Sequence, residues 1–465
     1  MNIVEQFGKK IIVFDGAMGT QLQAAGLAVG EYPDPWNIDH SEEVKEIHKK
    51  YLLAGSDVIT SNTFGSNRLN AGSTGYSVEE LITAAIKNCR GAIAEIIDKR
   101  KKDGLPERQM FTALDIGPTG KIVDLMGDLD FDGAYELFKE QVIAGTQAGA
   151  DLIIFETFSD IVELKAGIMA AKENSSLPIF CTMTFQDDGR MLMGTDPETA
   201  ILAIQDLGIS AIGVNCSLGP KELLPIISKI MNVAKIPVIA QPNAGLPNMK
   251  DGVATYDISQ EEFADYIVKI LETGVSVVGG CCGTTPEYIS KLSEKIEGKD
   301  YPALKRREEN ARSEKVVCTT TKHVFVGEEL SIIEDDSIDM DELTEDILAG
   351  DYEEATDVAM DIIDEGADIV AINMGFPMND EGEALKETIH TISMNGNLPI
   401  AIYSNVPEHI EDAVRYCRGR PLVMSNCLEG ELSDDIIRVA EKYGVDVVRN
   451  DEINGIMVGL NCSRK

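Results

Sequence analysis

Three cysteines lie at the ends of two apolar, β-branched segments. Cys216 ends the segment AIGVNC, and the adjacent Cys281 and Cys282 follow VSVVGG. Free cysteines are commonly buried and unreactive, but two neighbouring cysteines cannot both point into one apolar core from a regular strand. Glycines allow the backbone to turn both sulfurs toward one point, and three of them flank the pair: Gly279, Gly280 and Gly283. Three thiolates suit a tetrahedral zinc site with one open position, so the pattern predicts that Cys216, Cys281 and Cys282 bind zinc.

The charge of such a site indicates which chemistry it favours. Zinc held by three thiolates carries a formal negative charge and is a poor Lewis acid for activating water. It is better suited to holding a substrate thiol as a thiolate, because the thiol pKa of about 8.5 falls on metal coordination. The three cysteines therefore predict alkyl transfer to a substrate sulfur, with the metal keeping that sulfur deprotonated.

Other residues near the ends of apolar segments could hold the rest of a small substrate. Asp15 and Glu156 could pair with an ammonium group. In FDGAMGTQ, backbone amides around Gly19 and the hydroxyl of Thr20 precede a helical stretch and could hold a carboxylate. No Lys follows in the place that a phosphate-binding loop requires. The pattern therefore predicts an amino acid with a thiol side chain as the ligand.

The first 300 residues alternate short apolar segments with longer stretches of helical period. Near-continuous apolar segments of this length are typical of buried parallel strands. The eight segments span residues 11–16, 57–63, 111–117, 151–157, 179–185, 211–216, 237–243 and 275–283. Eight such units in about 300 residues favour a closed (β/α)8 TIM barrel. An open doubly wound sheet is the alternative, but it normally shows a glycine-rich dinucleotide turn after its first strand, and none follows here.

Nearly every one of these segments ends in a polar or metal-ligating residue. The residues in this series are Asp15, Asn62, Asp115, Glu156, Thr184, Cys216, Asn243 and Cys281. A single terminal carboxylate often only caps the next helix, but capping does not explain eight in series. Because the carboxyl ends of barrel strands converge on one face, where active sites lie, these side chains are predicted to form one site.

Length and charge define the class of protein. The chain has 465 residues, more than one domain usually contains, so two modules are expected. Its formal net charge of -38 would repel phosphate backbones and anionic membranes, which argues against nucleic acid as a partner. The sequence shows no signal peptide and no apolar run of about twenty residues, so no membrane association is expected.

Cysteine usage indicates the compartment. Nine cysteines without the spacing of a small disulfide-rich domain favour a reducing cytoplasm, where thiols stay free for metal binding. Six of them are expected only to pack: Cys89, Cys181, Cys318, Cys417, Cys427 and Cys462.

The motifs of residues 1–301 resemble those of the homocysteine S-methyltransferase family, most closely the N-terminal homocysteine-binding module of cobalamin-dependent methionine synthases. The motifs are FDGAMGTQLQ, SNTFGSN, ALDIGPTG, FETFSD, GVNCSLGP, QPNAGLP and GGCCGTTPEYI. The resemblance implies a TIM barrel in which Cys216, Cys281 and Cys282 bind zinc. It also implies residues that bind homocysteine or lie close to the metal: Asp15, Gly19, Thr20, Glu156, Asn215 and Asn243. Asn243 is implied as the ligand that fills the open zinc position when substrate is absent.

The rest of the chain predicts a second, smaller module. Residues 302–315 are charged and are expected to form a linker. Strand-like segments then recur at 368–375, 399–405, 421–427 and 445–451. Residues 316–465 resemble the first half of the pterin-binding barrel that follows the homocysteine module in methionine synthases, which implies a partial βα barrel. Open strand edges in such a half-barrel favour pairing with a second copy, as a homodimer, or capping of another surface.

This second module departs from the pterin-binding pattern. Asn373 stands where that family uses asparagine for the pterin. However, Ala371 and Tyr403 replace expected aspartates, and the later half of the barrel is not represented. These differences argue against methyltetrahydrofolate binding. The closing GLNCSRK carries no linker signature, which favours a natural end.

The methyl donor is open from the sequence. No segment resembles a cobalamin-binding module with its DxHxxG signature, so a methylcobalamin donor would be carried by a separate corrinoid protein. S-methylmethionine or a methylated amine is the competing donor, because related domains work without cobalamin. A further alternative is a docking or scaffold subunit for a corrinoid protein. The leading hypothesis is a zinc-dependent methyltransferase of one-carbon metabolism that converts homocysteine to methionine.

Overall fold

A computed structural model describes residues 2–123, 128–246, 248–250, 253–300, 315–326, 345–347, 349–364, 367–374, 381–425, 433–449 and 459–461. The chain folds into two compact units. Unit 1 comprises Met1–Leu192 and Ile209–Ala311, and unit 2 comprises Met193–Gly208 and Arg312–Lys465. The predicted linker lies outside the described residues, except for Lys315. Cys427 and Cys462 also lie outside them.

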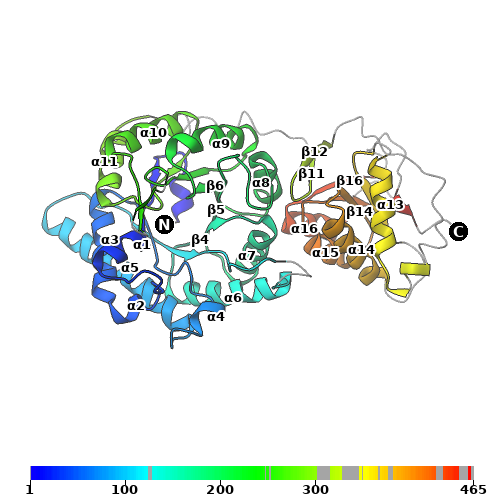
Figure 1. Ribbon diagram of the computed structural model, residues 1–465, viewed down its shortest axis with the longest axis horizontal. Helices are drawn as coiled ribbons and strands as arrows, with labels where there is room; N and C mark the ends of the chain where they lie inside the picture. Colours follow the sequence, from blue (N-terminus) through cyan, green and yellow to red (C-terminus); the bar gives the residue numbers. More distant parts are fainter. Residues whose placement is uncertain are drawn as a thin grey trace. The chain divides into compact units, whose positions relative to one another are not determined.

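Eight parallel strands form the centre of unit 1 (Figure 1). They are β1 (Ile12–Val13), β2 (Val58–Thr60), β3 (Phe111–Ile116), β4 (Leu152–Phe158), β5 (Ile179–Met183), β6 (Ala211–Asn215), β7 (Val238–Gln241) and β10 (Val277–Val278). Their order in the sheet is β1-β10-β7-β6-β5-β4-β3-β2. A parallel bridge between Phe14 and Val58 joins the two end strands and closes the sheet. The predicted (β/α)8 barrel is therefore confirmed, with every strand lying at a predicted segment.

Helices follow the strands along the chain, and Figure 1 shows them as an outer ring. They are α1 (Met18–Ala25), α2 (Trp36–Asp39), α3 (Ser41–Ala54), α4 (Arg68–Ala71), α5 (Val78–Lys102), α6 (Phe131–Ala148), α7 (Ile161–Asn174), α9 (Pro220–Val233), α10 (Gln260–Glu272) and α11 (Pro286–Ile296). A short 3-10 helix, η1 (Ile3–Gln6), precedes β1. Local signals fix several helix starts: Ser77 and Glu80 form a capping box at α5, and Pro286 opens α11.

Apolar side chains fill the interior of the barrel. Phe14, Ile154, Phe180 and Ile239 are all fully buried in one cluster that takes residues from the barrel strands. In β4 the neighbouring Phe155 faces outward, because its ring packs edge-on against Phe138 of α6 at 5.9 Å. The barrel is thus a packed core rather than a pore, and a ligand can enter only beyond the carboxyl ends of the strands.

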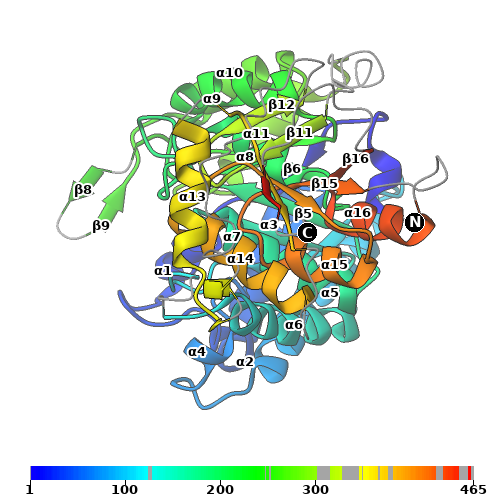
Figure 2. The same cartoon turned by 90° about the vertical axis from the view of Figure 1, so that its right-hand side faces the viewer.

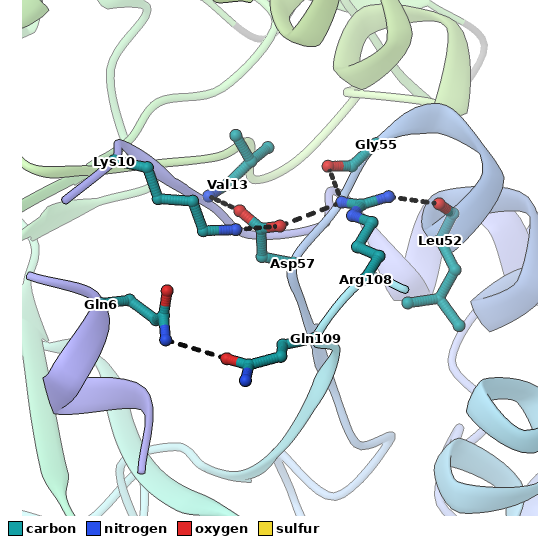
Figure 3. Close-up of polar contacts among 8 residues, drawn as sticks. All are labelled: Gln6, Lys10, Val13, Leu52, Gly55, Asp57, Arg108 and Gln109. Carbon is teal, nitrogen blue, oxygen red and sulfur yellow. Dashed lines mark hydrogen bonds and ion pairs between the residues drawn. The ribbon is translucent and has the colours of Figure 1, made fainter. Parts of the chain in front are cut away.

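The opposite end of the barrel is held together around one carboxylate (Figure 3). Asp57, just before β2, accepts a hydrogen bond from the backbone N–H of Val13 in β1 at 3.1 Å. Its other oxygen lies 2.7 Å from Nζ of Lys10 and 3.1 Å from Arg108. Arg108 also donates to the carbonyls of Leu52 and Gly55 at the end of α3. These bonds stabilise the seam between β1 and β2, where strand pairing is limited to one bridge.

A two-stranded antiparallel hairpin stands apart from the barrel sheet. Its strands, β8 (Asn248–Lys250) and β9 (Val253–Thr255), lie between β7 and α10 in the chain. Figure 2 shows the hairpin extending away from the barrel.

Unit 2 contains a smaller parallel sheet. Its strands are β13 (Val370–Asn373), β14 (Ile400–Tyr403), β15 (Leu422–Ser425), β16 (Asp446–Arg449) and β17 (Gly459–Asn461), in the order β16-β15-β14-β13-β17. The described helices of unit 2 are α8 (Pro197–Ile204), α13 (Glu353–Asp364), α14 (Glu381–Asn395), α15 (Pro407–Tyr416) and α16 (Asp434–Tyr443). The alternation of strands and helices confirms a partial βα architecture.

Two features of unit 2 were not predicted. An antiparallel hairpin of β11 (Lys315–Cys318) and β12 (His323–Val326) precedes the sheet, and Val317 packs into the apolar core of the sheet. A half-barrel of four strands was expected to leave the edge of its first strand, β13, open. Instead, β17, which lies at the start of GLNCSRK, pairs with β13 and covers this edge. A three-residue segment has too few residues to show strand periodicity. None of the helices in the described ranges is both long and apolar enough to span a bilayer.

Candidate active site at the carboxyl ends of the barrel strands

A cavity of about 270 Å³ lies beyond the carboxyl ends of the barrel strands. Seven of the nine predicted site residues line it: Asp15, Gly19, Thr20, Glu156, Cys216, Cys281 and Cys282. The remaining two, Asn215 and Asn243, are buried and do not appear in its lining. Of the other residues in the strand-end series, Asn62 and Asp115 line the cavity and Thr184 does not. The strand ends thus bring residues from most of the chain's first 282 positions to one site.

The three cysteine sulfurs meet in this cavity. All three Sγ atoms lie within 4.8 Å of one another, and Sγ of Cys216 is 3.8 Å from Sγ of Cys282. A tetrahedral zinc ion with Zn–S bonds of about 2.3 Å requires sulfur–sulfur separations of about 3.8 Å. The donor type and the spacing of this group therefore both fit zinc.

Unusual backbone conformations aim the sulfurs. Cys216 follows the end of β6 and has a positive φ of 59°, which turns its side chain out of the strand alternation. Its N–H donates to the carbonyl of Gln241 at 3.0 Å. Beyond the end of β10, the N–H of Cys281 donates to the carbonyl of Pro242 at 2.8 Å, and Gly283 takes a φ of 79° that favours glycine. Of the three flanking glycines, only Gly283 has a positive φ; Gly279 and Gly280 instead allow close packing, because a Cβ on Gly280 would collide with Oγ1 of Thr284.

The thiols strongly influence one another's protonation. Hydrogen bonds from Cys216 and Cys281 lower the pKa of the Cys282 thiol to about 3. Hydrogen bonds to Cys216 and Cys282, together with desolvation, raise the pKa of Cys281 well above its usual value. One thiolate is thus favoured, and it disfavours ionisation of its neighbours. Three thiolates can coexist here only with a compensating cation.

Backbone hydrogen bonds tie the segment of Asn243 to the segments that carry the cysteines. Its backbone N–H donates to the carbonyl of Leu218 at 3.0 Å, and the next residue, Ala244, donates to the carbonyl of Cys282 at 3.0 Å. Its side-chain Oδ1 is buried and has no hydrogen-bond partner among the described residues. An unsatisfied buried oxygen is costly, but Asn243 does not line the cavity, so its contact with a metal or substrate stays a prediction.

Three carboxyl groups line the same cavity. Desolvation raises the pKa of Asp15 well above its usual value, against the opposing effect of the Thr60 N–H that donates to Asp15 at 2.9 Å. Desolvation and the charge of Glu156 raise the pKa of Asp115 in the same direction. Desolvation, followed by the charge of Cys282, raises the pKa of Glu156 to about 7. The ionised form of such a group is stabilised by an incoming cation, for example an ammonium.

The start of α1 supplies the complementary polarity. Gly19 and Thr20 lie in the first turn of this helix, whose N-cap residue Ala17 makes no side-chain capping bond. The first N–H groups of a helix lack partners within the helix and favour an anion. The hydroxyl of Thr20 also accepts a hydrogen bond from the N–H of Gly283 at 3.4 Å, which links α1 to the cysteine pair.

The sequence did not predict several residues of the site. Asp115 belonged to the strand-end series, but the sequence did not assign it a role in substrate binding. In the structure its Oδ1 is buried and has no hydrogen-bond partner in the described part of the chain. Thr60 lines the cavity and donates to Asp15, and its polar side chain within an apolar strand could have indicated a site residue. Thr157 lines the cavity and Tyr256 hydrogen-bonds to Cys282, and neither had a sequence signal of its own.

Comparisons with known proteins identify relatives of this chain. Residues 12–296 match the family model for homocysteine S-methyltransferase. The chain is 27% identical over 440 residues to a methionine synthase of Mycobacterium tuberculosis, covering 91% of this chain and 36% of that protein. It is also 27% identical over 442 residues to a methionine synthase of Mycobacterium leprae, with the same coverage. The chain thus spans 36% of the length of the curated relatives it matches.

Solved structures show the same fold. The metallated form of the Escherichia coli homocysteine methyltransferase MmuM superposes with a TM-score of 0.53 at 21% identity, covering 62% of this chain and 96% of that chain. Its oxidised form gives a TM-score of 0.54 at 20% identity, covering 63% and 98%. At this level of identity the similarity concerns the barrel fold.

Proposed function

Because the chain belongs to the homocysteine S-methyltransferase family, we propose that it transfers a methyl group to the thiol of homocysteine and so forms methionine. The observation that carries this proposal is the composition of one cavity. Thiols of Cys216, Cys281 and Cys282 lie in the same 270 Å³ space as the carboxyl groups of Asp15 and Glu156. A cavity of this size fits a small amino acid whose sulfur and ammonium bind to different groups.

The carboxyl groups and α1 would hold the amino-acid end of the substrate. Asp15, Asp115 and Glu156 offer oxygens to the ammonium, whose positive charge would favour their ionised forms. The free N–H groups at Gly19 and Thr20 would receive the carboxylate. Holding both charged groups fixes the side chain of the substrate relative to the cysteines and reduces the entropy lost in reaching the reactive geometry.

Zinc is the metal that the site would hold. A zinc ion on Cys216, Cys281 and Cys282 would take the substrate sulfur as a fourth ligand and keep it deprotonated at neutral pH. Asn243, whose Oδ1 has no hydrogen-bond partner among the described residues, would fill the open zinc position when substrate is absent. Tyr256 hydrogen-bonds to Cys282 and would hold that ligand in orientation.

We propose a methylcorrinoid as the donor, because the barrel motifs resemble those of cobalamin-dependent methionine synthases. No segment of this sequence resembles a cobalamin-binding module with its DxHxxG signature, so we propose that another protein carries the corrinoid. Cytoplasmic location also remains a proposal.

In unit 2, Asn373 ends β13 and is half-buried, whereas Ala371 and Tyr403 occupy positions of expected aspartates. A homodimer formed through unit 2 stays a prediction.

The test is homocysteine-dependent demethylation of methylcobalamin by the zinc-loaded protein, followed by the corrinoid spectrum and by methionine formed. Transfer that disappears in Cys281→Ser supports the proposal. If zinc and homocysteine both bind but no transfer occurs, the corrinoid donor is wrong, and S-methylmethionine and methylated amines are then assayed as donors. Zinc-loaded protein that binds no homocysteine would contradict the proposed acceptor.

A further inference from the structure

Strand β4 is interrupted where it reaches the cavity. Its pairing with β5 shifts register between Phe155 and Phe158. In a regular strand, successive side chains point to opposite faces, so Glu156 and Thr157 should face opposite sides. Here both line the cavity. Bulges of this kind redirect side chains and are common beside active sites.

The bulge depends on a costly backbone conformation. Thr157 has a φ of 67°, in the left-handed region that β-branched residues rarely adopt. Such a conformation is unfavourable and persists only where surrounding contacts impose it. The contacts come from Asn215 at the end of β6. Its Oδ1 accepts from the N–H of Thr157 at 2.8 Å, and its Nδ2 donates to Oγ1 of Thr157 at 2.7 Å.

The same amide reaches the cysteines. Nδ2 of Asn215 lies 3.9 Å from Sγ of Cys281, and Asn215 immediately precedes Cys216 in the chain. Asn215 is 1% exposed and does not line the cavity. One buried side chain therefore connects the acidic wall of the cavity, through Thr157, to two of the three thiols.

We propose that the Asn215–Thr157 pair fixes the separation between Glu156 and the three thiols, and thereby sets the length of the thiol amino acid that the site accepts. This inference rests on the proposed function. A substrate held at its ammonium and at its sulfur must span a fixed distance. Homocysteine and cysteine differ by one methylene, so a rigid spacing discriminates between them. Asn215 and Thr157 are positioning residues in this role.

Thr157→Val is the sharpest test, because valine keeps the shape and the β-branch but loses the hydroxyl bond to Asn215. Thr157→Ser is the matched control, because it keeps the hydroxyl. Asn215→Ala removes both bonds and serves as a second variant. For each zinc-loaded 465-residue protein, we would measure zinc content and the dissociation constants of homocysteine and of cysteine by calorimetry, together with the thermal midpoint.

We expect wild type and Thr157→Ser to bind homocysteine more tightly than cysteine. Thr157→Val should retain zinc, but its ratio of the dissociation constants of cysteine and homocysteine should fall roughly tenfold, the effect of losing one hydrogen bond. Asn215→Ala should lose more of the preference. An unchanged preference in Thr157→Val and Asn215→Ala, with wild type binding homocysteine, would overturn the inference alone. Loss of zinc in Thr157→Val would also overturn it, since the pair would then serve metal binding. Wild type that binds zinc but not homocysteine would overturn the proposed function and this inference with it.

Discussion

Sγ of Cys216 lies 3.8 Å from Sγ of Cys282, although 66 residues separate them in the chain. They are carried by the ends of β6 and β10, which both neighbour β7 in the sheet. Because parallel strands of a barrel end on the same face, residues that follow them converge without any sequence proximity. The separation equals that of two sulfurs on one tetrahedral zinc, about 3.8 Å.

Replacing one of these thiols should abolish metal binding. Cys281→Ser is expected to lose zinc and methyl transfer together, because two thiolates do not complete the site. Metal analysis of the purified protein, alongside the transfer assay, checks this. Cys181→Ala is the matched control, since Cys181 is a buried thiol of β5 outside the group. Full activity of Cys281→Ser without bound zinc would defeat the proposed chemistry.

Glu156 should contribute to substrate binding and not to metal binding. Glu156→Gln keeps the size of the side chain but removes the charge that the ammonium would meet. We expect KM for homocysteine to rise roughly 10- to 100-fold, the range of a charge-assisted hydrogen bond of about 1.5–3 kcal/mol, with zinc content unchanged. Steady-state kinetics measures this, with the exposed Glu136→Gln as control. An unaltered KM would remove Glu156 from the substrate site.

Asp57 should stabilise the barrel without affecting the reaction. Asp57→Asn weakens the bonds to Lys10 and Arg108 at the end of the barrel opposite the cavity (Figure 3). We expect the free energy of unfolding to fall by about 1–3 kcal/mol, because Lys10 and Arg108 are partly exposed and can be solvated. Denaturant titration measures it, and Asp98→Asn on the exposed side of α5 is the control. Equal stability of the two variants would show that the seam does not depend on this carboxylate.

Stability should decrease as pH rises from 4.5 to about 7 because of Glu163. Desolvation raises its pKa to about 7 from 4.5, despite hydrogen bonds from Thr119. The folded protein therefore binds this proton more tightly than the unfolded chain, and the resulting stability is complete below pH 4.5 and is lost up to about pH 7. The difference between these two pKa values corresponds to about 3 kcal/mol.

Glu163→Gln tests this directly, because the amide keeps an acceptor for Thr119 but does not titrate. Unfolding free energies of wild type and variant, measured from about pH 5 to pH 8, should diverge as pH rises, with the variant the less sensitive of the two. Parallel pH profiles would show that Glu163 ionises without cost in the folded protein.

Much of the barrel and of its site was predictable from the sequence. Buried parallel strands leave continuous apolar segments, so all eight strand positions could be read from local composition. The polar residues at their ends, including Asp15, Glu156 and the cysteines, could be assigned to one face, since barrel topology alone places them there. The prediction of a metal site also rests on residue type, because three thiols suit few ligands other than a soft metal ion.

Other features arise only when distant segments pack together. The left-handed residue Thr157 forms hydrogen bonds with Asn215, 58 positions later, and nothing in FETF indicates this conformation. The raised pKa of Glu156 reflects desolvation and the charge of Cys282, and strand β17 is paired with β13, which precedes it by more than 80 residues. Local periodicity encodes which residues are apolar and where strands lie. Distances, strain and electrostatics depend on contacts between segments far apart in sequence, and these the tertiary structure alone decides.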